Sequence, residues 1–154
     1  MRIDAKPQAK INFKDNVHIQ LFDKDGKLKE ERRHENLVVT TGLAHIADQL
    51  SSSPGQGAMS HMAIGTGTTA AAAGDTTLQT ELDRNALTSR TDSGAVVTYV
   101  GTWAAGDGTG AITEEGIFNA SSSGTMLART VFSVINKAAS DTLVITHTIT
   151  FAAA

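Results

Sequence analysis

The sequence predicts an all-β protein, an antiparallel β-sandwich with one short helix; a jelly-roll is one form of such a sandwich. Short apolar segments recur every eight to fifteen residues or so and are joined by turns rich in Gly and Ser. The clearest segment is 143–151, where Leu, Ile, His, Ile and Phe alternate with Val and Thr. Strict alternation places one set of side chains toward a core and the other outward.

Residues 1–15 are predicted to form an extended N-terminal arm, and residues 16–154 a single β-sandwich domain. Pro7 disfavours a regular helix in the arm, and its apolar residues are spaced too widely to form a core alone. Since ordering a free arm costs backbone entropy, we expect it to bind a neighbouring chain, partly by strand addition. The candidate partner-binding residues are Arg2, Ile3, Lys6, Lys10, Ile11, Phe13 and Lys14.

A hairpin is expected directly after the arm. Residues 17–22 read as a strand, Asp23 to Gly26 as a turn, and residues 28–33 as the return strand with solvated charges. The turn resembles a calcium loop only superficially. A calcium loop of the EF-hand type that began at Asp23 would need a glycine at Leu28 and a glutamate at His34, so a metal is not expected there.

The only substantial helix is predicted after a short apolar strand at 37–39. Thr41 can cap its first turn through the side-chain oxygen. Ser and Pro residues in 51–55 end the helix. The helical spacing indicates one apolar face, made of Leu43, Ile46, Ala47 and Leu50.

The sequence predicts that the rest of the chain is organised around the stretch 59–84. It opens with an apolar segment at 59–64 and then turns sharply at Gly65 and Gly67, which permit unusual backbone angles. The sequence IGTGTT lacks the Lys of a phosphate-binding P-loop, and the third glycine and βαβ pattern of a dinucleotide fingerprint are missing. No nucleotide cofactor is therefore expected.

Three further strands and one ambiguous segment follow. Residues 85–94 read as a loop or a weak edge strand. Residues 96–103 form a strand that is apolar on both faces, with Tyr99 and Trp103 on one of them. Residues 112–119 form the next strand, with a bulge expected at Gly116. Residues 126–135 form a strand that pairs after a Ser- and Gly-rich hairpin loop.

Charge and composition exclude several functions. The 154 residues carry a net charge of -3, and residues 36–154 hold four basic against nine acidic side chains. An acidic body argues against nucleic-acid binding. The absence of cysteine excludes disulfides and thiolate sites. No apolar run is long enough for a membrane span and no secretory signal is evident, so we expect a protein made in the cytoplasm with no membrane partner.

No constellation of catalytic or metal-binding residues is apparent, and we expect no enzymatic activity and no cofactor. His147, on an apolar strand face, is interpreted as a core or interface histidine. Adjacent strand residues Glu114 and Glu115 point to opposite faces, so they are expected either to be solvated or to bridge to Arg84 or Arg129. The five histidines lie too far apart in sequence to suggest zinc: His18, His34, His45, His61 and His147.

Four segments, at 36–50, 62–84, 112–120 and 127–151, together resemble small virion structural proteins of tailed bacteriophages. They read NLVVTTGLAHIADQL, MAIGTGTTAAAAGDTTLQTELDR, ITEEGIFNA and LARTVFSVINKAASDTLVITHTITF. The class includes capsid decoration (cement) proteins and tail-fibre or baseplate components. The resemblance implies a β-rich assembly protein located in the virion, without catalytic residues.

Within that class the preferred interpretation is a decoration protein that binds the major capsid protein. A compact domain with a short arm suits it, whereas a fibre would show repeats or a coiled-coil stalk. A tail-fibre, baseplate or neck adaptor is the second interpretation. A carbohydrate-binding module is the third, with Tyr99 and Trp103 as its aromatic platform. The apolar residues on both faces of 96–103 predict a homo-oligomer, with a trimer preferred.

Overall fold

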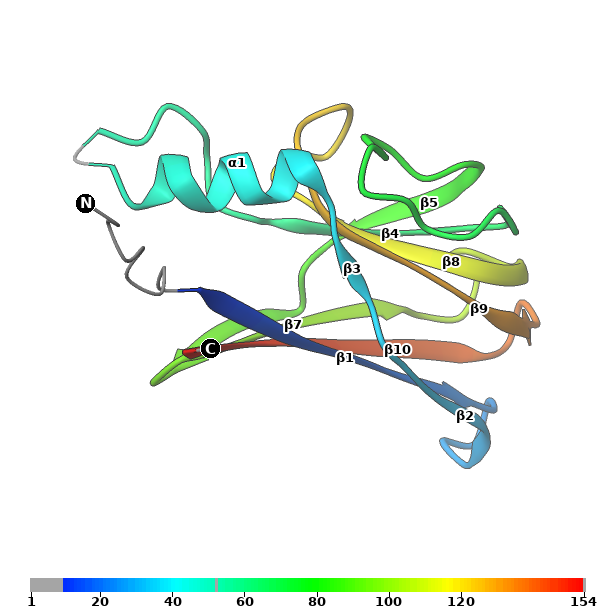
Figure 1. Cartoon of the computed structure of the whole chain (residues 1–154). Helices are drawn as coiled ribbons and strands as arrows, with labels where there is room; N and C mark the ends of the chain where they lie inside the picture. The colour runs from blue at the N-terminus through cyan, green and yellow to red at the C-terminus, as the bar shows by residue number, and fades with distance from the viewer. Residues whose placement is uncertain (1–9, 52, 154) are drawn as a thin grey trace, which may run out of the picture.

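The chain forms two antiparallel sheets that face each other, with one helix across one end (Figure 1). The computed structural model describes residues 10–51 and 53–153. Its elements are β1 (Ile11–Phe22), β2 (Leu28–His34), β3 (Leu37–Val38), α1 (Thr40–Gln49), β4 (His61–Gly65), β5 (Glu81–Ala86), β6 (Ser89–Ser93), β7 (Val96–Trp103), β8 (Gly110–Phe118), β9 (Met126–Lys137) and β10 (Thr142–Ala153).

Each sheet has five strands. Sheet A has the order β2-β1-β10-β7-β6, and sheet B has the order β3-β9-β8-β4-β5. Every ladder in both sheets is antiparallel. The predicted all-β sandwich with one short helix is therefore confirmed. This strand order does not establish the jelly-roll form.

β10 lies at the centre of sheet A, between β1 and β7. It pairs with β1 from Phe22↔Thr142 to Ile11↔Ala153. The alternation in its sequence is confirmed, since Leu143, Ile145, His147 and Ile149 are buried. The intervening threonines are only partly buried and point to the other face of the sheet.

The core between the sheets is built mainly from aliphatic side chains, as the low aromatic content predicts. Trp103 is the largest fully buried side chain, and it packs with residues of both sheets. Tyr99 is also buried. Both aromatic residues of β7 are therefore inside the sandwich, so they cannot form the exposed platform that a carbohydrate-binding module would need.

The expected boundary between arm and domain, at residues 15 and 16, is wrong for the residues that the structure describes. β1 begins at Ile11, and residues 11–15 pair with β10 as regularly as the rest of the strand. The rings of Phe13 and Phe151 meet edge to face, with their centroids 5.3 Å apart. Side chains at odd positions from 11 to 21 share one face, but Asp15 interrupts their apolar pattern and concealed the strand. Residues 1–9 of the arm lie outside the described residues.

The position of the helix was predicted correctly, but its cap and buried face were not. α1 follows Val39 and has no side-chain cap; the Thr41 hydroxyl instead donates to the Met126 carbonyl. The buried residues are Gly42 and His45, whereas Leu43 and Leu50 are exposed. A Cβ at Gly42 would lie 2.0 Å from the carbonyl oxygen of Leu127. α1 therefore turns its glycine toward β9 because only a glycine permits so close an approach.

Of the two alternatives for segment 85–94, a loop or a weak edge strand, the edge strand is confirmed as β6, whereas β5 was not predicted. The bulge expected at Gly116 needs correction. Irregular register in β8 occurs between Ile112 and Glu114 and between Ile117 and Phe118, not at Gly116. Gly116 is instead a place of close packing, where a Cβ would lie 3.0 Å from Leu78 Cδ2.

Candidate functional site

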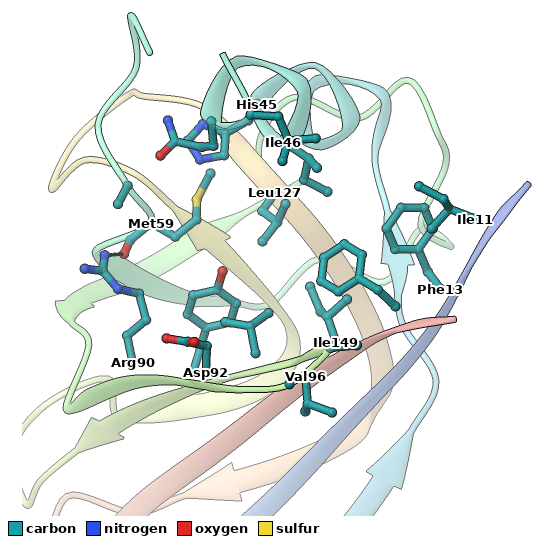
Figure 2. Close-up of a pocket in the computed structure, with 18 residues that line it drawn as sticks. Ile11, Phe13, His45, Ile46, Met59, Arg90, Asp92, Val96, Leu127 and Ile149 are labelled. Carbon is teal, nitrogen blue, oxygen red and sulfur yellow. Dashed lines mark hydrogen bonds between the residues drawn. The ribbon is translucent and has the colours of Figure 1, made fainter. Parts of the chain in front are cut away.

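A cavity of about 550 Å³ opens between α1 and the end of sheet A (Figure 2). A volume of this size is typical of sites that hold a small molecule or an inserted side chain. α1 contributes its buried face, and β1, β6, β7 and β10 contribute the floor. The cavity exists because α1 covers sheet B and leaves this end of sheet A uncovered.

The lining of the cavity is mainly apolar. Figure 2 shows Ile11 and Phe13 on one side of the cavity and Met59 with Arg90 on the other, with Ile149 between them. The apolar lining residues are Ile11, Phe13, Ile46, Leu50, Ala58, Met59, Ala95, Val96, Val97, Leu127, Ile149 and Phe151. Such a surface gains free energy when another apolar group covers it.

Four residues with ionisable side chains lie in this lining, together with the amide of Gln49: His45, Arg90, Asp92 and Tyr99. His45 is 4% exposed, and its Nδ1 has no hydrogen-bond partner among the described residues. A guanidinium nitrogen of Arg90 donates to the Met59 carbonyl. Burial raises the pKa of the Tyr99 hydroxyl, which is therefore neutral at physiological pH. The cavity thus combines an apolar body with a polar side next to β6.

Two large apolar side chains at the mouth of the cavity are exposed. Ile11 is 67% exposed and Leu50 is 83% exposed, and both line the cavity. We call this pair the apolar rim. Leu43, about two helical turns before Leu50, is 44% exposed. Isolated exposed apolar residues are ordinary, but these two enlarge the apolar surface that the cavity presents to solvent.

The structure places the predicted partner-binding residues as follows. Ile11 and Phe13 line the cavity, so the structure brings these two together with α1. Lys10 and Lys14 are exposed near the same end of β1. Lys14 and Phe13 also border a second cavity, of about 600 Å³, beside Asp15 and Asn36. Arg2, Ile3 and Lys6 lie outside the described residues.

The stretch 65–80 is organised around the carboxylate of Glu114, which is fully buried. Oε1 accepts from the backbone N–H groups of Gly67 and Thr80, and Oε2 accepts from that of Gln79. Oε2 also accepts two hydrogen bonds from Arg129. Burial opposes ionisation, but these donors outweigh it and hold the pKa of Glu114 below its ordinary value.

Arg129 connects this carboxylate to the loop. Its Nη1 lies 2.7 Å from Asp75 Oδ2, and its Nη2 donates to the Thr69 carbonyl. Of the two bridges expected for the Glu114–Glu115 pair, the one to Arg129 is confirmed. Arg84 instead pairs with Glu81 and lies over the ring of Phe118. The expectation of a solvated glutamate pair is wrong, because both side chains are fully buried.

The glycines of IGTGTT are explained by this carboxylate. A Cβ at Gly67 would lie 2.4 Å from Glu114 Oε1, and a Cβ at Gly65 would lie 2.4 Å from the Thr80 carbonyl oxygen. No real Cβ atom tolerates such contacts. The two glycines therefore permit the loop to approach a protein carboxylate, where a phosphate-binding loop would approach a phosphate.

Glu115 points to the opposite face of β8, into the sandwich, where it meets His147 of the facing sheet. Glu115 Oε1 lies 3.0 Å from His147 Nδ1, and Asp15 Oδ1 lies 2.7 Å from His147 Nε2. Asn36 donates to the other oxygen of Asp15. We call Asp15, Glu115 and His147 the inter-sheet triad.

Two carboxylates flank His147 and favour its protonated form. Burial opposes its charge, but the negative charges of Glu115 and Asp15 outweigh burial and raise the pKa of His147 to about 10. Nδ1 is hydrogen-bonded to Glu115, and Nε2 lies 2.7 Å both from Asp15 Oδ1 and from the side-chain nitrogen of Asn36. The interpretation of His147 as a core histidine agrees with this geometry, and the inter-sheet triad joins the two sheets.

Sequence reasoning did not find the inter-sheet triad or the polar side of the cavity. Asp15, Glu115 and His147 are far apart in sequence, and only the pairing of β1 with β10 brings two of them together. One signal was available: Asp15 and His147 each interrupt an otherwise apolar period of two. Two such interruptions on predicted core faces indicate a buried pair, because a lone buried charge is too costly.

Among the described residues, no group of three or more His, Asp or Glu side chains is arranged to hold a metal ion. No helix within residues 10–51 and 53–153 has the length and apolar character needed to cross a bilayer. Comparisons with protein-family models, with curated proteins and with solved structures find no match to this chain.

Proposed function

We propose that the chain is a structural protein of a tailed-bacteriophage virion, and that it acts as a capsid decoration protein on the major-capsid shell. The proposal starts from the resemblance of residues 36–151 to small phage structural proteins. It includes association with further copies of the chain. The confirmed β-sandwich is compatible with this role and does not by itself select it.

The observation that carries the proposal is the apolar rim of Ile11 and Leu50 around the open cavity. Covering these side chains would lower the free energy by about 25 cal/mol for each Å² of apolar surface removed from water. An apolar segment of the shell protein fits the cavity as its occupant.

Two exposed cations lie near the same end of β1. Lys14 is on the face of β1 opposite to Ile11 and Phe13, and neither Lys10 nor Lys14 lines the cavity. They would add an electrostatic attraction to acidic groups of the shell. Because both are exposed, that attraction is screened by salt, and attachment should weaken as ionic strength rises.

The proposal assigns no catalytic step to the chain. The inter-sheet triad is the only cluster that resembles a catalytic arrangement among the described residues. Its histidine is fully buried and lies against two carboxylates. A histidine that no substrate can reach cannot act as a general base, so the triad is assigned to stability.

The test mixes the purified chain with shells and with tails that are prepared separately from the phage that encodes it. Co-sedimentation with shells, followed by cryo-EM of the decorated particle, supports the decoration role. Binding to tails and not to shells would replace it with the tail or baseplate adaptor. Binding to neither would overturn the assignment to the virion surface.

Substitutions then test the apolar rim. Leu50→Glu and Ile11→Glu should each weaken binding to shells at least about tenfold, because a charge would have to be buried at the contact. Leu28→Glu is the matched control: Leu28 is an exposed leucine of β2 that does not line the cavity. Equal binding of all three variants would show that the contact lies elsewhere.

A further inference from the structure

β6 is an open edge of sheet A. It pairs with β7 on one side, and no strand follows it in the order of the sheet. All five of its residues are exposed. The opposite edge, β2, carries the sequence LKEERRH, whose dense charges discourage pairing with another strand. β6 has the sequence SRTDS, which contains neither proline nor lysine and only one charge of each sign. Its edge is therefore less strongly protected than that of β2.

The charges of β6 are arranged symmetrically about Thr91. Arg90 and Asp92 flank it and lie on the same face of the strand, because side chains alternate along a strand. Both line the cavity, so this shared face is the one turned toward α1. Ser89 and Ser93 complete the symmetry on the other face, together with Thr91.

We propose that β6 pairs antiparallel with β6 of a second copy of this chain, about a two-fold axis at Thr91. In this register Arg90 of each copy lies opposite Asp92 of the other. Thr91 lies opposite Thr91, and Ser89 lies opposite Ser93. Opposite charges and Thr–Thr pairs directly across a ladder are favourable cross-strand pairs. The edge is thus complementary to itself, as a two-fold contact requires.

The charges also select this register over its neighbours. A two-fold axis at Arg90 would place the two Arg90 side chains opposite each other, and an axis at Asp92 would do the same with two carboxylates. Like charges directly opposite destabilise a pair of strands. A two-fold axis that passes between two neighbouring residues is excluded. It would pair a residue whose backbone N–H and C=O face the partner strand with one whose groups face away from it.

Pairing at β6 joins the two copies of sheet A into one continuous ten-stranded sheet. It also changes the cavity, because Arg90 and Asp92 line it in each copy. The two inter-copy ion pairs would lie along the polar side of both cavities, while the apolar rim remains free at Ile11. This contact produces a dimer, whereas the sequence analysis preferred a trimer. Formation of the dimer does not depend on binding to a capsid.

Sedimentation velocity of the purified full chain, over a range of concentrations at low salt, tests this dimer. The wild-type chain should reach twice its monomer mass of 16.1 kDa. Arg90→Asp gives an edge with two negative charges, and Asp92→Arg gives an edge with two positive charges. Each variant alone should dimerise at least about tenfold more weakly, since two favourable pairs become two repulsive ones.

The decisive sample is an equimolar mixture of Arg90→Asp and Asp92→Arg. Every charged pair across a mixed dimer is then of opposite sign, so the mixture should form a heterodimer at concentrations where each variant alone is monomeric. Arg33→Asp is the control, because it makes the same charge change at the opposite edge of sheet A. It should dimerise as the wild type does.

Circular dichroism of each variant establishes that it is folded, and the mixture needs only two folded variants to be informative. A wild-type chain that stays monomeric at about 100 µM, or one that forms a trimer, overturns the proposal. So does a mixture that associates no better than its components, or dimerisation that is unchanged in both single variants.

Discussion

Arg129 and Glu114 are joined by two hydrogen bonds to a single oxygen. Arg129 Nε donates to Glu114 Oε2 at 2.9 Å, and Nη2 donates to the same atom at 2.8 Å. Oε1 is thereby left to accept from the backbone of the loop at Gly67 and Thr80. One buried carboxylate thus neutralises an arginine and fixes the course of the segment that covers sheet B.

Replacing this carboxylate should be among the most damaging single changes in the chain. Glu114→Gln removes the charge and turns an amide group toward donors that need an acceptor. We expect the free energy of unfolding to fall by about 3 kcal/mol, as is usual when one partner of a buried ion pair is lost. Urea denaturation of the variant and of the wild type measures this loss of unfolding free energy.

The matched control is Glu81→Gln, which removes a glutamate whose pairing with Arg84 is partly exposed. This substitution should lower the free energy of unfolding by less than about 1 kcal/mol. Equal losses for the two variants would contradict the role given to Glu114.

Gly67 should not tolerate even the smallest side chain. A Cβ there would meet Glu114 Oε1 at 2.4 Å, so Gly67→Ala must displace the loop or the carboxylate. We expect a loss of about 2 kcal/mol or more in unfolding free energy, within the range for overpacking a buried site. Gly57→Ala is the control, since nothing lies within 4 Å of its Cβ. An unchanged thermal midpoint for Gly67→Ala would count against this close packing.

Stability should decrease in alkaline solution because of His147. Its pKa rises from 6.5 when unfolded to about 10 when folded, so the folded chain holds a proton that the unfolded chain has lost. The resulting stabilisation is complete below about pH 6.5 and disappears as the pH rises through 10, at up to about 1.4 kcal/mol for each pH unit.

Urea denaturation between pH 7 and pH 10 measures this dependence. In His147→Gln the decrease over that window should be absent, although the variant is less stable throughout because Asp15 and Glu115 lose their partner. A wild-type stability that is flat from pH 7 to pH 10 would show that His147 is neutral in the folded chain.

The contribution of Glu114 to the stability of the fold changes with pH in the opposite direction. Because its pKa is lowered on folding, its contribution is present above its unfolded value of 4.5 and is lost as the pH falls through the folded value. Wild-type stability should therefore be greatest between these acid and alkaline limits. Glu114→Gln should lose less stability than the wild type on acidification below pH 4.5.

The ring contact between Phe13 and Phe151 should be measurable as a coupling energy. The two residues are directly paired in the ladder between β1 and β10, with an interplanar angle of 66°. A double-mutant cycle with Phe13→Ala and Phe151→Ala should give about 0.5–1.5 kcal/mol. A coupling near zero would indicate that β1 is not held at the cavity as described.

Periodicity in the sequence was enough to predict the central strands. β7 was predicted with its observed bounds at 96–103, and β10 within one or two residues, because apolar alternation is strong in both. The same rule placed the apolar face of α1 wrongly. Leu43 and Leu50 have the correct helical spacing, yet the contact with β9 requires a glycine, and so Gly42 and not leucine faces inward.

Polar residues in the core explain most of what the sequence did not reveal. Asp15 concealed the first half of β1, since a charge on a core face reads as the end of a strand. Its partner His147 lies on β10, and no local pattern connects the two. The segment that holds Arg90 and Asp92 was left open between a loop and a weak edge strand for a related reason: a short polar edge strand lacks the apolar alternation by which strands are recognised.

The central position of β10 has a consequence for how the protein is made. β1 is among the first strands to leave the ribosome, but its long ladder is with β10, the last strand described here. Until β10 emerges, the nascent chain holds β1 and β7 with unpaired edges that will later face each other across it. Contacts so distant in sequence form slowly. Sheet A is therefore completed only after β10 has been synthesised, and until then the unpaired edges of β1 and β7 are natural binding sites for chaperones.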